Sequence, residues 1–121
     1  SVQDIPYSIT GSFNCTNGNW LELSSDGSVQ LGVQDNSRIY RGDAAYLGVV
    51  PEGMVLGVST SETADGMPGI TFVAAMKYEL HTNTLSLTIL DGPNPFAEGK
   101  TQLQMIRCPD TWPQRVPLTA D

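Results

Sequence analysis

At 121 residues the chain fits one domain, over residues 1–121, and is long enough to bury a single hydrophobic core. Its 13 Asp and Glu outnumber its 6 Lys and Arg, and the formal net charge of −7 disfavours nucleic acid and anionic lipid as partners but suits a basic protein. Apolar residues make up 40% of the chain, and no apolar run approaches the ~18 residues that a membrane-spanning helix requires.

The two cysteines predict the compartment. Cys15 and Cys108 lie far apart, so they do not resemble a Cys-x-x-Cys redox or zinc pair, and an even count in a small Gly- and Pro-rich chain indicates one disulfide. The chain begins at Ser1 rather than Met, which indicates either a removed signal or lipoprotein leader, with a lipid anchor ahead of Ser1 in the second case, or a trimmed chain. We therefore expect a mature periplasmic or extracellular protein.

Alternating apolar residues predict strands from near the N-terminus onwards. The first strand is expected over Tyr7–Cys15 and the second over Trp20–Leu23. A three-residue loop at Ser25–Gly27, with its glycine in the left-handed conformation, then sets Leu23 opposite Val29, where a third strand begins.

The middle of the chain has two interpretations. Arg38–Arg41 and Ala45–Val50 form either two short strands split by Gly42-Asp43 or one bent strand. Pro51–Gly53 marks a turn, and alternation resumes over Met54–Val58.

The most regular stretch runs from Gly69 to Leu90 and predicts a hairpin. Apolar residues fall on one face of each of its two strands, at Ile70, Phe72, Ala74, Met76, Tyr78 and Leu80 and then at Leu85, Leu87 and Ile89. A four-residue loop at His81–Thr84 sets Leu80 opposite Leu85, so the two apolar faces lie on the same side of the sheet.

The last strand is expected from Leu103 to Cys108, and the Pro-rich tail, residues 109–121, is expected to be extended. With an ordered core over about residues 7–108, short strands at roughly 8–12-residue spacing predict an all-β fold. We expect a small antiparallel up-and-down β-barrel, calycin- or lipocalin-like, of eight or nine strands and closed by the disulfide. Nine is favoured, because both cysteines follow strand ends, and these ends lie on one side of a meander only when the strand count is odd.

Two long polar loops, residues 61–68 and 91–100, are separated by two strands and a tight turn, so they emerge at the same end of the sheet. This end is acidic and has two apolar tips. We expect steering charges and apolar anchors for a protein partner there, namely Asp65, Asp91 and Glu98 as charges and Met67 and Phe96 as anchors.

The sequence has no catalytic, cofactor or metal motif. His81 is the only histidine, lies in an expected turn and has no ligand at zinc-site spacing, and no serine triad can be built around it. The Asp, Asn and Gly clusters do not follow calcium-loop spacing, although calcium held by loops at the barrel end is an alternative. Arg41-Gly42-Asp43 spells a tripeptide that integrins read, but a turn that breaks a strand explains it better. We predict a protein that is not an enzyme, with a hydrolase that uses converging carboxylates as the minor alternative.

The cysteine-bearing segments resemble the small periplasmic or membrane-bound inhibitors of C-type lysozyme. The matching residues are Phe13-Asn14-Cys15, Gly18, Leu21-Glu22-Leu23 and Leu103–Cys108, about a quarter of the chain. The resemblance implies a small antiparallel barrel in the bacterial envelope that inserts a loop into the cleft of a basic enzyme. The family's inhibitory loop reads Ser-Gly-x-x-Tyr, whereas Ser37-Arg38-Ile39-Tyr40 lacks the glycine, so no inhibitory residue carries over.

Two binding functions follow from these observations. The first is a secreted or periplasmic binding protein that inhibits a basic hydrolase such as lysozyme through the acidic loops. The second is a lipocalin-like carrier that holds a small apolar ligand inside the barrel, lined by Phe72, Met76, Tyr78 and Leu87.

Overall fold

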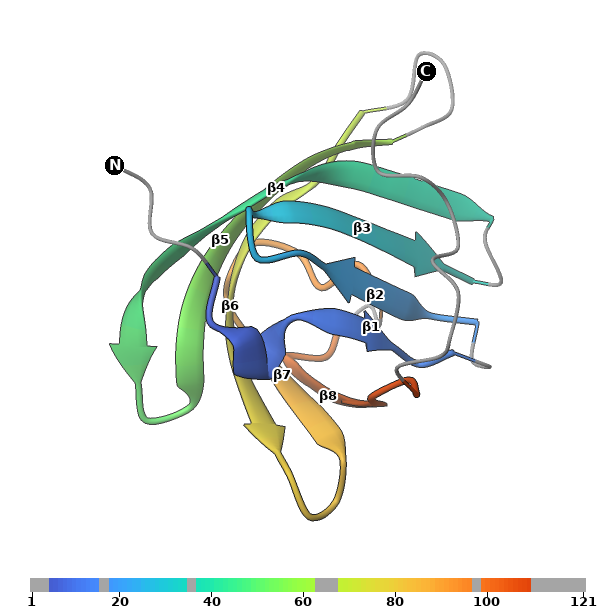
Figure 1. Cartoon of the computed structure of the whole chain (residues 1–121). Helices are drawn as coiled ribbons and strands as arrows, with labels where there is room; N and C mark the ends of the chain where they lie inside the picture. Colours follow the sequence, from blue (N-terminus) through green and yellow to red (C-terminus); the bar gives the residue numbers. More distant parts are fainter. Residues whose placement is uncertain (1–4, 16–17, 35–36, 63–67, 97–98, 110–121) are drawn as a thin grey trace.

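Period-two alternation folds this chain into one eight-stranded antiparallel sheet, in which every strand pairs with its neighbours in sequence. The computed structural model describes residues 5–15, 18–34, 37–62, 68–96 and 99–109 (Figure 1). The sheet curls into a nearly closed up-and-down barrel, as predicted. Its strands are β1 (Gly11–Phe13), β2 (Trp20–Leu23), β3 (Ser28–Val33), β4 (Arg38–Val50), β5 (Gly53–Glu62), β6 (Thr71–Glu79), β7 (Thr84–Asp91) and β8 (Gln102–Ile106).

The barrel closes where β1 meets β8, and the predicted Cys15–Cys108 disulfide lies at this seam, with 5.5 Å between its Cα atoms. The two strands are antiparallel but overlap only at their C-terminal ends, through a bridge between Phe13 and Arg107. Asn14 then turns the chain with φ of 61°. Both cysteines therefore follow the same short overlap, and an even strand count brings them together.

Of the two expected strand counts, eight is confirmed and the favoured nine is wrong, because β4 is one continuous strand of 13 residues. Gly42 and Asp43 do not break it, since Gly42 pairs with Val29 of β3 on one side and Thr60 of β5 on the other. A side chain at Gly42 would collide with the backbone carbonyl of Ser59, so glycine serves close strand approach here rather than a turn. The Arg-Gly-Asp tripeptide is thus part of a paired strand.

The first expected strand is also partly wrong. Tyr7–Ile9 forms a short 3₁₀ helix, η1, and β1 begins only at Gly11. The helix ends at Thr10, whose N–H and hydroxyl both donate to the Tyr7 carbonyl, at 3.1 and 2.9 Å. This local pairing replaces the ladder bonds that a strand would need, while Ile9 remains fully buried.

Two of the predicted hairpins can be compared with the structure residue by residue. Leu23 pairs with Val29 as expected, and Gly27 has φ of 96°. In the β6–β7 hairpin, by contrast, Tyr78 rather than Leu80 pairs with Leu85. The register differs by two residues, so the side chains within the strands keep their predicted faces. Leu80 lies beyond the end of β6, in the turn, and is exposed.

The barrel interior is filled by its own side chains. Phe72, Met76 and Leu87 are buried there, and Tyr78 packs against the core at its edge. Each strand contributes inward residues, including Phe13, Leu21, Leu31, Leu56, Leu85 and Met105. The residues expected to line an internal ligand cavity form the close-packed core instead.

Candidate functional site: an apolar groove beside η1

The predicted acidic site at the loop end is only partly described. Asp65, Met67 and Glu98 lie outside the described residues. Asp91 is the last residue of β7 and is exposed. Because β6 and β7 are antiparallel neighbours, the connections before β6 and after β7 do emerge at one end of the barrel, as expected.

Phe96 is not an exposed apolar tip, so this part of the prediction is wrong. Its exposed fraction is 8%, and it belongs to the hydrophobic core. The Asn94 Oδ1 atom accepts a hydrogen bond from the Phe96 N–H at 2.9 Å, which turns the loop inward and carries the ring towards the core. Phe96 therefore helps to seal the loop end.

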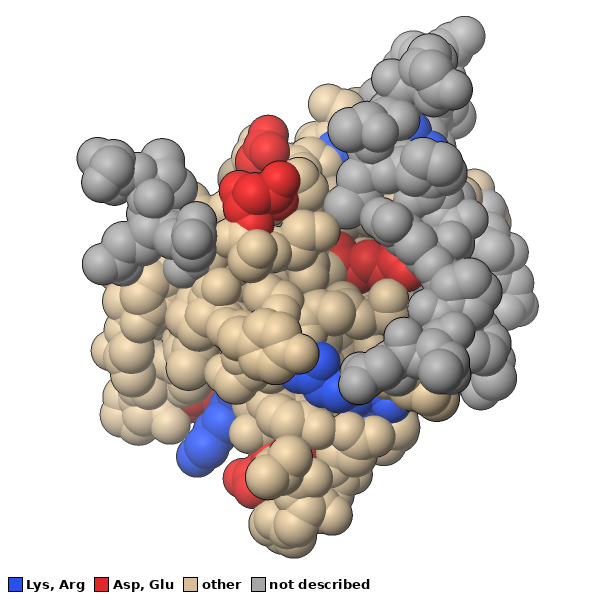
Figure 2. All heavy atoms as spheres, in the orientation of Figure 1, with Lys and Arg blue, Asp and Glu red and all other residues tan. Residues whose placement is uncertain are grey.

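The opposite end of the barrel carries exposed apolar side chains that the sequence did not assign to a site. It consists of η1, the β4–β5 turn and the β6–β7 turn. Tyr7, Val49 and Leu80 are exposed there to 86%, 70% and 80%. In Figure 2 most of the visible surface around η1 carries neither acidic nor basic side chains. Several large apolar side chains at one rim indicate a contact surface rather than chance exposure.

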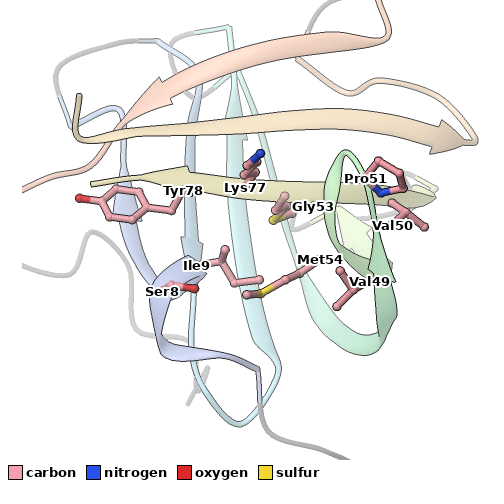
Figure 3. Close-up of a pocket in the computed structure, with 10 residues that line it drawn as sticks. Ser8, Ile9, Val49, Val50, Pro51, Gly53, Met54, Lys77 and Tyr78 are labelled. Atoms are coloured by element: carbon pink, nitrogen blue, oxygen red, sulfur yellow. The ribbon is translucent and has the colours of Figure 1, made fainter. Parts of the chain in front are cut away.

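A hollow of about 330 Å³ lies between η1 and the β4–β5 hairpin. Ile9 and Met54 extend towards each other across it, with Val49 beside Met54, whereas Lys77 points to the other side of the sheet (Figure 3). The remaining lining comes from Ser8, Val50, Pro51, Gly53, Met76 and Tyr78. The wall is thus almost entirely apolar.

A β-bulge at Leu47 places Val49 at this hollow. The pairing of β4 with β5 shifts between Tyr46 and Gly48, so Val49 pairs with Met54. The extra residue reverses the alternation, and Val49 turns to the face that Met54 occupies. Without the bulge Val49 would lie on the outer face of the barrel.

The hollow exists because β4 is longer than β3. The pairing with β3 ends at Asp43, and within the described residues Ala45–Val50 pair only with β5. This part of β4 extends beyond its neighbour, as Figure 1 shows. The η1 helix, with Ile9 as its buried residue, contributes the other wall of the hollow.

A second hollow, of about 450 Å³, is lined by Tyr7, Ser8, Tyr78, Leu80 and Arg107. It shares Ser8 and Tyr78 with the first, so the two hollows adjoin each other at η1. We call this combined surface, the lining of both hollows, the η1 groove. Its size falls in the range of small-molecule sites, roughly 300–1,000 Å³.

Arg107 holds η1 against the barrel. Its Nη1 donates to the Thr10 carbonyl at 2.7 Å, and its Nη2 donates to the Ser8 carbonyl at 2.6 Å. Its guanidinium carbon lies 4.9 Å from the ring centroid of Phe13 and 4.3 Å from that of Tyr78. The cation thus rests on two aromatic faces, which attract it through their quadrupoles.

Other candidate groups remain outside the groove. His81 is exposed, and its Nδ1 lies 3.9 Å from the Glu79 carboxylate, a contact that is an ion pair only when the imidazole is protonated. The described part of the chain contains no cluster of three His, Cys, Asp or Glu that could hold a metal ion. Arg41 donates from Nε to the Gln30 side chain at 2.9 Å along the sheet. The groove itself offers mostly apolar surface, with the hydroxyls of Ser8, Tyr7 and Tyr78, the Arg107 guanidinium and Lys77 among its lining, which suits binding.

Comparison with protein-family models, with curated proteins and with solved structures finds no match. Within the part of the chain that the structure describes, no helix has the length and apolar content to cross a membrane.

Sequence reasoning missed the η1 groove because it assigned Tyr7 and Leu80 to strand faces. The available signal was their apolar character next to Pro6 and His81, where strands are expected to end.

Proposed function

We propose that this protein is a secreted or periplasmic binding protein that takes a small apolar ligand in the η1 groove. The observation that carries this proposal is the ring of exposed apolar side chains, Tyr7, Val49 and Leu80, around a hollow with an apolar floor. The disulfide supports an oxidising compartment.

The ligand site is at the mouth of the barrel rather than in its interior. Phe72, Met76 and Leu87 fill the interior, and opening a cavity there would forfeit their packing. The groove needs no such rearrangement, because its walls already stand apart.

The test uses a neutral apolar dye, Nile red, titrated by fluorescence. Val49→Gln places an amide in the groove and should weaken dye binding by about tenfold, a loss of roughly 1–2 kcal/mol of apolar contact. Leu90→Gln makes the same kind of change at an exposed residue of β7 outside the groove and should leave binding unchanged. Equal binding by both variants and the parent protein would place the dye elsewhere. An organic extract of the natively produced protein, examined by mass spectrometry, should contain the ligand.

A second candidate function, inhibition of a basic hydrolase such as C-type lysozyme, draws on the net charge of −7 and the exposed Asp91 at the loop end. Phe96 is not available as its anchor, so charge would carry most of the contact. Binding to lysozyme should then weaken steeply as salt rises, and Asp91→Asn should slow association. Salt-independent binding, or none, would remove this candidate.

A further inference from the structure

Arg107 forms one wall of the second hollow and has no acidic partner among the residues that the structure describes. No carboxylate lies within ion-pair distance of it in the described part of the chain. Within the described residues its charge meets two neutral carbonyls, those of Ser8 and Thr10, and the faces of the Phe13 and Tyr78 rings. A partly buried cation gains most from an anion that approaches it in a poorly hydrated site.

The guanidinium also keeps donors for such an anion. Arginine has five N–H groups. One on Nη1 and one on Nη2 are used by η1, and the Nε–H is buried without a hydrogen-bond partner. A second N–H therefore remains on each Nη atom. Lys77 and Glu79 stand on either side of the inward-facing Tyr78 in β6, so strand alternation turns both side chains to the other face of the sheet, as Figure 3 shows for Lys77.

The apolar walls and the cation adjoin each other. Tyr7, Tyr78 and Leu80 line the same hollow as Arg107, and the hollow between Ile9, Val49 and Met54 adjoins it at Ser8 and Tyr78. A ligand that fills both would be apolar over most of its length and negatively charged at one end. Carboxylate is the anion whose planar geometry best matches a guanidinium.

Resting on the proposed function of the groove, we propose that its ligand is an apolar carboxylate. The carboxylate meets the free Nη donors of Arg107, and the hydrocarbon part lies along η1 towards Val49 and Met54. Tyr7 and Leu80, exposed in the structure, cover the ligand at the rim.

The first experiment compares decanoate with decanol on the unaltered protein by isothermal titration. The two probes share their hydrocarbon chain, so only the head group differs. We expect decanoate to bind roughly ten- to a hundredfold more tightly, the range of a charge-assisted hydrogen bond, and to lose this advantage partly at high salt. Equal affinity for the two probes would overturn the carboxylate proposal while leaving the apolar groove intact. Failure of both to bind would overturn the groove itself.

The second experiment places the head group. Leu80→Glu adds a negative charge at the rim of the hollow, and Leu80→Gln adds a side chain of the same shape without charge. Leu80 is exposed in a turn, so neither change should disturb the fold. Leu80→Glu should bind decanoate at least several-fold more weakly than Leu80→Gln does. The two variants should bind decanol with the same affinity. An identical effect on the two probes would place the carboxylate away from Arg107.

Arg107→Gln provides the direct test. The variant should bind decanoate no more tightly than decanol, and it should still bind decanol. A variant that keeps the preference for decanoate would refute the assignment. If η1 detaches and decanol binding is lost too, the Leu80 pair decides the question.

Discussion

The two ends of this barrel are closed in different ways. At the loop end a long connection, residues 92–101, folds an aromatic ring inward, and Phe96 joins the core. At the η1 end the β4–β5 turn has only Pro51 and Glu52 between paired residues, which is too short to fold back over the barrel mouth. The apolar residues around that mouth therefore remain exposed, with Ile9 of η1 as the plug.

The difference teaches that long polar loops do not show which end of a barrel leaves apolar side chains exposed. Long polar loops look like binding loops, yet length also lets a loop cover its own end. Short turns leave apolar residues exposed because they lack the reach to bury them. An exposed apolar surface can therefore arise at the end where the turns are short.

The strongest test of this comparison is Phe96→Ala. A core aromatic should cost roughly 3–5 kcal/mol of unfolding free energy, whereas an exposed anchor would cost well under 1 kcal/mol. Urea denaturation followed by tryptophan fluorescence measures the change. Leu80→Ala, at the exposed rim of the other end, serves as the control and should be nearly neutral. A neutral Phe96→Ala would mean that the loop end is open.

Ile9→Ala tests the plug of the η1 end and should cost about 2–4 kcal/mol, since this side chain is fully buried. Tyr7→Ala, two residues earlier and exposed, should change stability by no more than about 0.5 kcal/mol. The same urea titration compares the two variants. Equal effects would show that η1 does not seal the barrel.

The seam between β1 and β8 depends on Asn14. This residue has φ of 61°, and its side chain accepts a hydrogen bond from the Ile106 N–H at 3.0 Å. Asn14→Ala should destabilise by about 1–2 kcal/mol, because alanine disfavours this backbone conformation and lacks the acceptor. Asn14→Gly keeps the conformation accessible and should cost less. If Asn14→Gly unfolds at a lower temperature than Asn14→Ala, the backbone conformation of residue 14 does not limit the stability of the seam.

The smallest expected effect is at Asp26, in the β2–β3 turn. Hydrogen bonds from the Ser28 backbone N–H and hydroxyl lower the pKa of its carboxyl below the ordinary 3.8. Because the folded-state pKa is the lower one, the ionised group stabilises the fold above pH 3.8, and this contribution is lost as the pH falls through the lowered pKa. Asp26→Asn should therefore be slightly destabilising at neutral pH and equal to the parent protein in strong acid. A difference that grows on acidification would contradict the assignment.

Much of the fold could be predicted from local pattern. The strand over Trp20–Leu23, a third strand that follows the loop with a left-handed Gly27, and the disulfide are all confirmed; the third strand begins at Ser28, one residue before the predicted Val29. Register was less secure, and the β6–β7 hairpin differs from expectation by two residues. A two-residue shift preserves which face is buried, so the hydrophobic pattern cannot detect it.

By itself, the sequence determined the all-β class and the faces that enter the core, because alternation and turn chemistry act over a few residues. It also determined the disulfide, because the chain has two cysteines and no motif that would use them otherwise. Only the tertiary structure decided that β4 continues through Gly42, that Phe96 turns inward and that η1 leaves a groove beside Val49 and Arg107. Each of these depends on how far one strand extends beyond another and on what a loop reaches across space, which no local pattern records.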